Sequence, residues 1–231
     1  MPETAQNLCR IYLISPPEFS LRAFPKQLCA TLKAGDVACF QLRLKEADDK
    51  TIRNVSRHLL PICQEHGVAF LVNDRPDLAA DVGADGVHVG AKDETYAATR
   101  SMVGKESIVG VSCYDSLHSA LIAGEEGADY VAFGAFYPTK TKQPRTRAEP
   151  KILSWWRKAT TVPSVAIGGI TVDNCGPLIR AGADFLAVIS GVWNHPRNPE
   201  TAISLFNDEI AKHSNTGTGE PNAQELVLPA G

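Results

Sequence analysis

Two groups of basic residues stand at or directly behind short apolar runs of this sequence. In the run VACFQLRLK, Gln41, Arg43 and Lys45 alternate, so they share one face if the run is an extended strand. A second run, YVAFGAF, leads into the loop PTKTKQPRTR, which contains Lys142. Charge-assisted hydrogen bonds to phosphate oxygens are worth roughly 1.5–3 kcal/mol each. Taken alone, the basic loop would usually be a solvated face or a weak nucleic-acid patch. In a chain of net charge −3, a bound anion is the alternative that the other features must decide.

Two carboxylates follow the next apolar runs along the chain. Asp74 stands beside Asn73 at the end of AFLVND, and Asp93 comes shortly after GVHVG. Mg²⁺ generally takes one or two carboxylates and completes its shell with water and substrate phosphate. Asp74 and Asp93 therefore predict one Mg²⁺ site, and with the nearby cations they indicate a magnesium diphosphate. The amides of Gln41 and Asn73 remain to bind a polar heterocycle or an amide.

Glycine-rich turns end the last two apolar runs, at Gly168–Gly169 and at Ser190–Gly191. Backbone N–H groups in such turns can approach phosphate oxygens closely, because no side chain intervenes. The turns therefore predict a second anion site, of a size that suits a monophosphate.

Each of these features has a simpler interpretation when it is taken alone. Arg43 and Lys45 could be surface charges, and Asn73–Asp74 could be an ordinary turn. His88 lies within an apolar run and is more often a core histidine than a catalyst. What favours a binding site is that all of these features would meet at one end of the fold described next.

The chain alternates short strand-like runs with segments of helical periodicity. Eight runs of strand character are present, and helix-length segments such as TIRNVSRHLLPICQEH lie between them. This alternation predicts parallel strands joined by right-handed crossovers. Three junctions repeat the pattern Gly-Ala-Asp before a strand, at 83–85, 127–129 and 182–184. We therefore predict a single (β/α)₈ TIM barrel. A doubly wound open sheet is the alternative, but no G-x-G-x-x-G follows the first run.

Length and composition agree with one barrel and exclude several other classes. The chain has 231 residues, of which 44% are hydrophobic and 21% charged, and such barrels run to about 250 residues. A net acidic chain argues against nucleic-acid binding. No apolar run reaches the ~18 residues of a membrane span, and the N-terminus shows no signal-peptide pattern. The six cysteines form no C-x-x-C pair, which predicts buried thiols and a cytoplasmic setting.

The domain organisation follows from the same patterns. Residues 1–213 are expected to form the barrel. Residues 214–231 are polar and rich in Gly and Pro, so we expect them to form a flexible C-terminal tail.

At this point the motifs resemble those of one enzyme family. QLRLK, NDRPDLAADVGADGVHVG, GVSC, FGAFYPTKTK, VAIGGITVDN and AGADFLAVISG occur in the order found in bacterial thiamine phosphate synthases, between about residues 10 and 210. The P-T-x-T-K loop combined with A-I-G-G-I is highly discriminating. The resemblance implies that hydroxymethylpyrimidine diphosphate and thiazole phosphate are joined, with release of diphosphate. It also makes a homo-oligomer plausible.

The resemblance also assigns roles to individual residues. It implies that Mg²⁺, bound by Asp74 and Asp93, assists the departure of diphosphate and leaves a pyrimidine carbocation. Those implied to hold the pyrimidine diphosphate are Gln41, Arg43, Lys45, Asn73, Ser112 and Lys142. Those implied to hold the thiazole phosphate are Thr139, Thr141, Gly169, Ile189 and Ser190. Among them, the groups expected to act in catalysis are Arg43, Lys45, Ser112 and Lys142.

The sequence departs from the family pattern at Leu44, at Ala91–Lys92 and at Tyr114, none of which is an implied ligand. Two other functions remain open. A thiazole tautomerase-like isomerase would share the barrel and the thiazole phosphate site, with His88 as the residue to suspect. A non-catalytic phosphometabolite-binding paralogue would bind one phosphate ligand without turnover.

Overall fold

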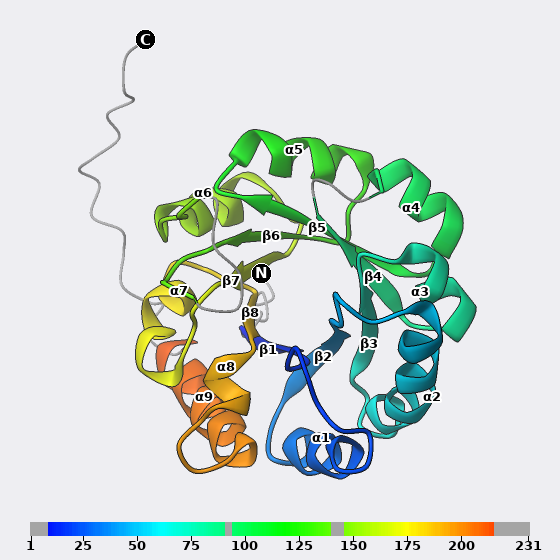
Figure 1. Ribbon diagram of the computed structural model, residues 1–231. Coiled ribbons are helices and arrows are strands. Elements are labelled where there is room, and N and C mark those ends of the chain that lie inside the picture. Colours follow the sequence, from blue (N-terminus) through cyan, green and yellow to red (C-terminus); the bar gives the residue numbers. More distant parts are fainter. Residues whose placement is uncertain (1–8, 91–93, 140–145, 215–231) are drawn as a thin grey trace, which may run out of the picture.

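A closed barrel of eight parallel strands forms the centre of the molecule (Figure 1). The computed structural model describes residues 9–90, 94–139 and 146–214. Each strand pairs with its neighbours in chain order, and β1 pairs with β8 to close the barrel. This confirms the predicted fold class. The strands are β1 (Arg10–Ile14), β2 (Val37–Leu42), β3 (Ala69–Asn73), β4 (Gly86–Val89), β5 (Ile108–Tyr114), β6 (Tyr130–Gly134), β7 (Ser164–Ile167) and β8 (Phe185–Val188).

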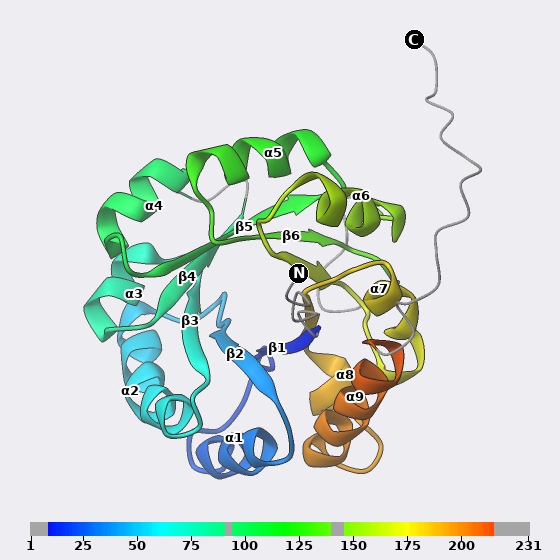
Figure 2. The same ribbon diagram turned by 180° about the vertical axis from the view of Figure 1, so that it is seen from behind.

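Helices surround the barrel as an outer ring (Figures 1 and 2). The last helix, α9, packs against both α7 and α1 and so completes this ring. It includes Ser214, which the sequence had assigned to the tail, and residues 215–231 lie outside the described part. The helices are α1 (Phe24–Lys33), α2 (Asp49–Glu65), α3 (Pro76–Val82), α4 (Tyr96–Val103), α5 (Leu117–Glu126), α6 (Lys151–Ala159), the 3₁₀ helix η1 (Val172–Asn174), α7 (Gly176–Arg180), α8 (Ser190–Trp193) and α9 (Pro199–Ser214).

Two apolar layers explain why the strands read as continuous apolar runs. Outward-facing side chains such as Phe40 and Phe70 pack between the strands and the helices. Inward-facing ones, among them Tyr12, Cys39 and Tyr130, fill the barrel interior. Both faces of each strand are therefore covered, as in other parallel sheets. Within the described ranges, no helix is both long and apolar enough to span a bilayer.

The repeated Gly-Ala-Asp junctions hold the starts of neighbouring strands. Gly83 and Gly127 end their helices with φ values of 69° and 100°, as predicted for these positions. Each following aspartate accepts a backbone N–H from the preceding strand at 2.7 Å: Asp85 from Phe70, Asp129 from Val109 and Asp184 from Ser164. A carboxylate clasp of this kind fixes the register at the amino-terminal end of the barrel.

Removing one clasp should lower stability. In Asp184→Ala, the Ser164 amide loses its charged acceptor, and so does the Ser164 hydroxyl at 3.0 Å. We expect the free energy of unfolding to fall by roughly 1–3 kcal/mol, measured by denaturant titration. Asp208→Ala, at an exposed position of α9, is the control and should change it little. Equal stability of the two variants would contradict the role of the clasp.

The cysteines are free thiols, and all but Cys29 are buried. Burial raises the pKa of Cys63 and of Cys113 to about 12, and that of Cys175 to about 11. At neutral pH these thiols are protonated as well as shielded, and the thiolate is the reactive form. We expect a thiol reagent to label Cys29 first in the native protein and the others only on unfolding. Rapid labelling of Cys113, read by mass spectrometry, would contradict this.

Candidate functional site

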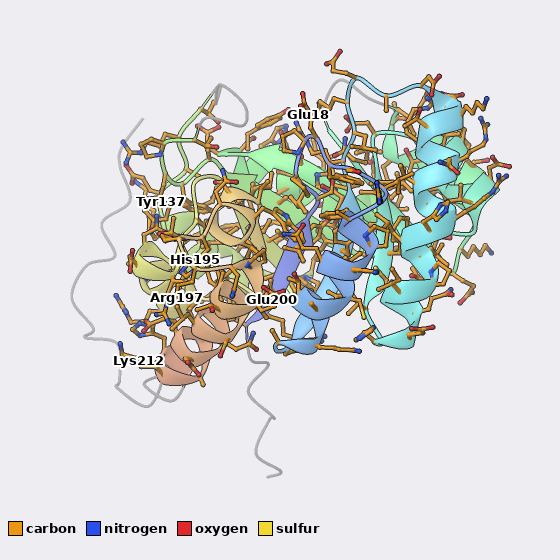
Figure 3. The ribbon with its side chains drawn as sticks, turned by 60° about the horizontal axis from the view of Figure 1, so that its bottom comes forward. Glu18, Tyr137, His195, Arg197, Glu200 and Lys212 are labelled. Carbon is orange, nitrogen blue, oxygen red and sulfur yellow. The ribbon has the colours of Figure 1, made fainter. Side chains whose placement is uncertain are left out.

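A cavity of about 370 Å³ opens at the carboxyl ends of the strands. Figure 3 shows the barrel from the side, with Glu18, in the loop after β1, toward one end and Lys212, near the end of α9, toward the other. The sequence-predicted site residues that line the cavity are Arg43, Lys45, Asn73, Asp74, Ser112, Thr139, Gly169, Ile189 and Ser190. They come from the ends of β2, β3, β5, β6, β7 and β8 and converge on one space, as the barrel geometry requires.

One wall of the cavity carries charge. Lys45 Nζ lies 3.3 Å from Asp74 Oδ2, and Arg43 lines the same wall. Partial burial lowers the pKa of the Arg43 guanidinium, while the charge of Asp74 opposes that shift. A guanidinium keeps its proton under such conditions. With two cations facing one carboxylate, this wall suits an anion.

Asp74 is held in place by its backbone. It adopts the left-handed region with φ of 62°, which aspartate tolerates better than most residues do. Its N–H donates to the carbonyl of His88 at 2.8 Å. Asp74 directly follows Asn73, the last residue of β3, and its carboxylate lines the cavity at the end of that strand.

The opposite wall is made of backbone and small apolar groups. Gly169 has φ of 64°, and a Cβ there would overlap the carbonyl oxygen of Pro138. The loops after β6 and β7 are joined further by the Tyr137 N–H, which donates to the Gly168 carbonyl at 3.0 Å. The glycines therefore allow the loop that carries Thr139 to lie against the β7 loop.

The turn after β8 completes this wall. Ser190 begins α8, and a Cβ at Gly191 would overlap the carbonyl oxygen of Ile170. Among the hydrogen bonds of the described loops, none is donated by the N–H groups of Ser190 or Gly191. Such unpaired donors next to a glycine turn suit a phosphate group.

A row of hydroxyl groups and one imidazole leads from His88 and Ser112, which line the cavity, into the barrel interior. His88 Nε2 is 2.8 Å from Ser112 Oγ, and His88 Nδ1 is 2.9 Å from the Tyr130 hydroxyl. The Tyr130 hydroxyl is in turn 2.8 Å from that of Tyr12. Burial raises the pKa of both phenols well above the usual value, so both stay neutral.

The structure also differs from the sequence interpretation. Gln41 was predicted to share a face with Arg43 and to bind substrate, but it is 2% exposed and does not line the cavity. His88 lines the cavity, although its sequence context favoured a core position. Of the residues that depart from the family pattern, Leu44 packs against the core and Tyr114 lines the cavity. Other predicted site residues fall outside the described ranges: Asp93, Thr141 and Lys142.

The Asp74 carboxylate fits a Mg²⁺ ligand, because it lines the cavity beside cations that could hold the same phosphate oxygens. No cluster of three or more His, Cys, Asp or Glu suited to a metal occurs within residues 9–90, 94–139 and 146–214. The described wall therefore offers one carboxylate, which is compatible with an ion that completes its shell from substrate and water.

Comparison with known proteins agrees with this geometry. The thiamine-phosphate synthase of Rhodospirillum centenum is 59% identical over 199 residues, covering 86% of this chain and 96% of that protein. That of Hyphomonas neptunium is 49% identical over 214 residues, covering 90% and 97%. Among solved structures, the thiamine phosphate pyrophosphorylase of Pyrococcus furiosus has a TM-score of 0.78 at 28% identity, over 91% of this chain and 99% of that one.

The sequence pattern described as thiamine monophosphate synthase matches residues 11–192. This match runs from β1 to α8 and so includes every strand end that forms the cavity. The chain therefore belongs to the thiamine monophosphate synthase family.

Proposed function

We propose that this chain is a transferase of thiamine biosynthesis that joins hydroxymethylpyrimidine diphosphate to thiazole phosphate. The bond between the pyrimidine methylene carbon and the diphosphate oxygen breaks, and a bond from that carbon to the thiazole nitrogen forms. The products are thiamine phosphate and diphosphate. The family membership and the relatives named thiamine-phosphate synthase support this activity.

The observation that carries the proposal is the contrast between the two walls of one cavity. Arg43, Lys45 and Asp74 form a charged wall, whereas Gly169 and Ser190 belong to a wall of bare backbone. A diphosphate with its metal suits the first wall, and a monophosphate suits the second. The cavity thereby holds the two reacting groups side by side, which converts a bimolecular step into an effectively unimolecular one.

Arg43 and Lys45, on the charged wall, hold the departing diphosphate by charge-assisted hydrogen bonds. The family resemblance adds Lys142, which lies outside the described ranges, to this set. Asp74 and Asp93 would hold Mg²⁺, which when bound neutralises charge on the leaving diphosphate. Asn73 and Ser112 orient the pyrimidine, whereas Gln41, which the family resemblance adds to this set, does not line the described cavity. The catalytic effect is electrostatic stabilisation of a leaving anion in a preorganised site. No general base is needed when the thiazole nitrogen attacks the carbocation.

On the backbone wall, the N–H groups near Gly169 and Ser190 hold the thiazole phosphate, together with Thr139. The family resemblance assigns Thr141, which lies outside the described ranges, to the same phosphate. Ile189 provides an apolar contact beside it. We also propose a cytoplasmic setting, because the free, buried thiols suit a reducing compartment.

The test is diphosphate release from the purified protein given both phosphorylated precursors, with and without Mg²⁺. We expect magnesium-dependent release that requires the thiazole partner, with an equal amount of thiamine phosphate formed. If diphosphate is not released while thiazole phosphate still binds, the tautomerase or the non-catalytic interpretation replaces this one. Isomerisation of the thiazole phosphate, followed by NMR, would then separate those two.

A further inference from the structure

Three neighbouring strands place a histidine, a glycine and a tyrosine in one row that leads from the cavity lining into the barrel interior. The strand register pairs His88 of β4 with Gly110 of β5, and Gly110 with Tyr130 of β6. A Cβ at Gly110 would overlap the Tyr130 ring. The missing side chain lets the Tyr130 and His88 rings stack across β5, with centroids 5.7 Å apart and an interplanar angle of 17°. The absence of a side chain at Gly110 therefore permits this ring contact. His88 in turn connects the barrel interior to Ser112.

The hydrogen bonds along this row can run continuously in only two directions. If Tyr12 donates to Tyr130, then Tyr130 donates to His88 Nδ1, and His88 Nε2–H donates to Ser112 Oγ. If every bond is reversed, Ser112 donates to His88 Nε2 instead. The tautomer of His88 thus decides whether the Ser112 hydrogen is available to a ligand in the cavity.

The buried end of this row of hydrogen bonds determines the direction of donation. Tyr12 is 3% exposed, and in the described structure its hydroxyl bonds only to Tyr130. In the reversed direction the Tyr12 hydrogen would have no acceptor, and an unsatisfied buried donor is costly. Neither phenol can escape this constraint by ionising, because burial keeps both protonated. Tyr130 therefore gives its hydrogen to His88.

We infer that Tyr130 is a positioning residue that holds His88 in the Nε2–H tautomer and so makes Ser112 a hydrogen-bond donor toward the cavity. The ligand atom that meets Ser112 is then an acceptor, such as an unprotonated ring nitrogen or a phosphoryl oxygen, and not an amino group. This substrate contact of Ser112 deepens the proposed function and rests on it. The tautomer of His88 does not depend on the proposed function.

The tautomer can be read without substrate. In protein labelled with ¹⁵N-histidine, long-range ¹H–¹⁵N spectra distinguish a protonated ring nitrogen from an unprotonated one, and His88→Gln assigns the signals. We expect an unprotonated Nδ1 and a protonated Nε2 in the unmodified protein. A protonated Nδ1 would overturn the inference, whatever the enzyme activity.

Two phenylalanine variants separate positioning from packing. Tyr130→Phe keeps the stacked ring but removes the donor, so the Nδ1 signal should move toward the protonated range. Tyr12→Phe removes a hydroxyl from the same apolar layer but leaves Tyr130 only His88 to donate to, so the tautomer should be retained. An unchanged tautomer in Tyr130→Phe, or an equal shift in both variants, would overturn the role of Tyr130.

Steady-state kinetics provide a second test of the role of Tyr130. In Tyr130→Phe we expect kcat/KM for the pyrimidine diphosphate to fall about 5- to 10-fold, the equivalent of one hydrogen bond. The KM for thiazole phosphate should stay unchanged, because that substrate meets the opposite wall. If both substrates are affected equally, the residue has a general structural role and the inference fails.

Discussion

Asp74→Asn is expected to lower turnover by at least ~10²-fold, as the loss of one preorganised electrostatic group commonly does. Asparagine has the same shape and tolerates the left-handed φ of 62° that this position adopts, so the backbone should not change. What changes is the charge: the Lys45 ammonium, 3.3 Å away, loses its carboxylate, and the proposed Mg²⁺ site loses one of its two proposed carboxylates. Turnover at saturating substrate and binding of Mn²⁺, followed by its paramagnetic signal, measure the two effects.

The matched control for this change is Asp77→Asn. Asp77 lies on α3, pairs with Arg75 at 2.6 Å and does not line the cavity. It lies close in sequence and carries the same charge, so a general effect of lost negative charge should appear in both variants. Near-normal turnover in Asp74→Asn would remove this residue from the mechanism.

Gly169→Ala should weaken the binding of thiazole phosphate. Its φ of 64° strains any other residue, and the added Cβ would overlap the Pro138 carbonyl oxygen. The β6 and β7 loops must therefore separate, which displaces both Thr139 and the backbone N–H groups of the turn. Backbone strain of this type costs about 1–3 kcal/mol, so KM for thiazole phosphate should rise roughly 10-fold or more.

Gly67→Ala supplies the control, because Gly67 has the same φ of 64° but a methyl group added there would meet no atom within 4 Å. Gly67 lies in the turn before β3, at the amino-terminal end of the barrel. Both variants should lose stability, whereas only Gly169→Ala should change KM. If steady-state kinetics show no difference between them, the β7 turn does not hold the phosphate.

The sequence predicted the barrel well, because its strands and helices differ in apolar periodicity. The run at 69–74 became β3, with Asp74 just beyond its end. The segment at 51–66 became α2, Asp49–Glu65, which shows that the helical pattern placed this element to within two residues. Local patterns of this kind depend only on neighbouring residues, so they can be read without knowing the fold.

Local sequence periodicity could not predict how deeply each site residue is buried or which distant residues it contacts. Alternation predicted one face for Gln41, Arg43 and Lys45, but it cannot say that Arg43 and Lys45 line the cavity whereas Gln41 is buried away from it. His88 looked like a core residue because its partners, Tyr130 and Ser112, are 42 and 24 residues away. Only the register of β4, β5 and β6 brings them together.

The aspartate clasps at the amino-terminal end divide the barrel into two-strand units. Before β2, Asp36 also holds the preceding strand, but through the Arg10 guanidinium at 2.6 and 2.7 Å. All four even-numbered strands are therefore tied to the odd strand before them, which makes the two-strand unit a module repeated four times. The other three ties each use a backbone N–H of the odd strand. Such modules should be exchangeable between relatives, since the ties do not depend on the residues at the cavity mouth.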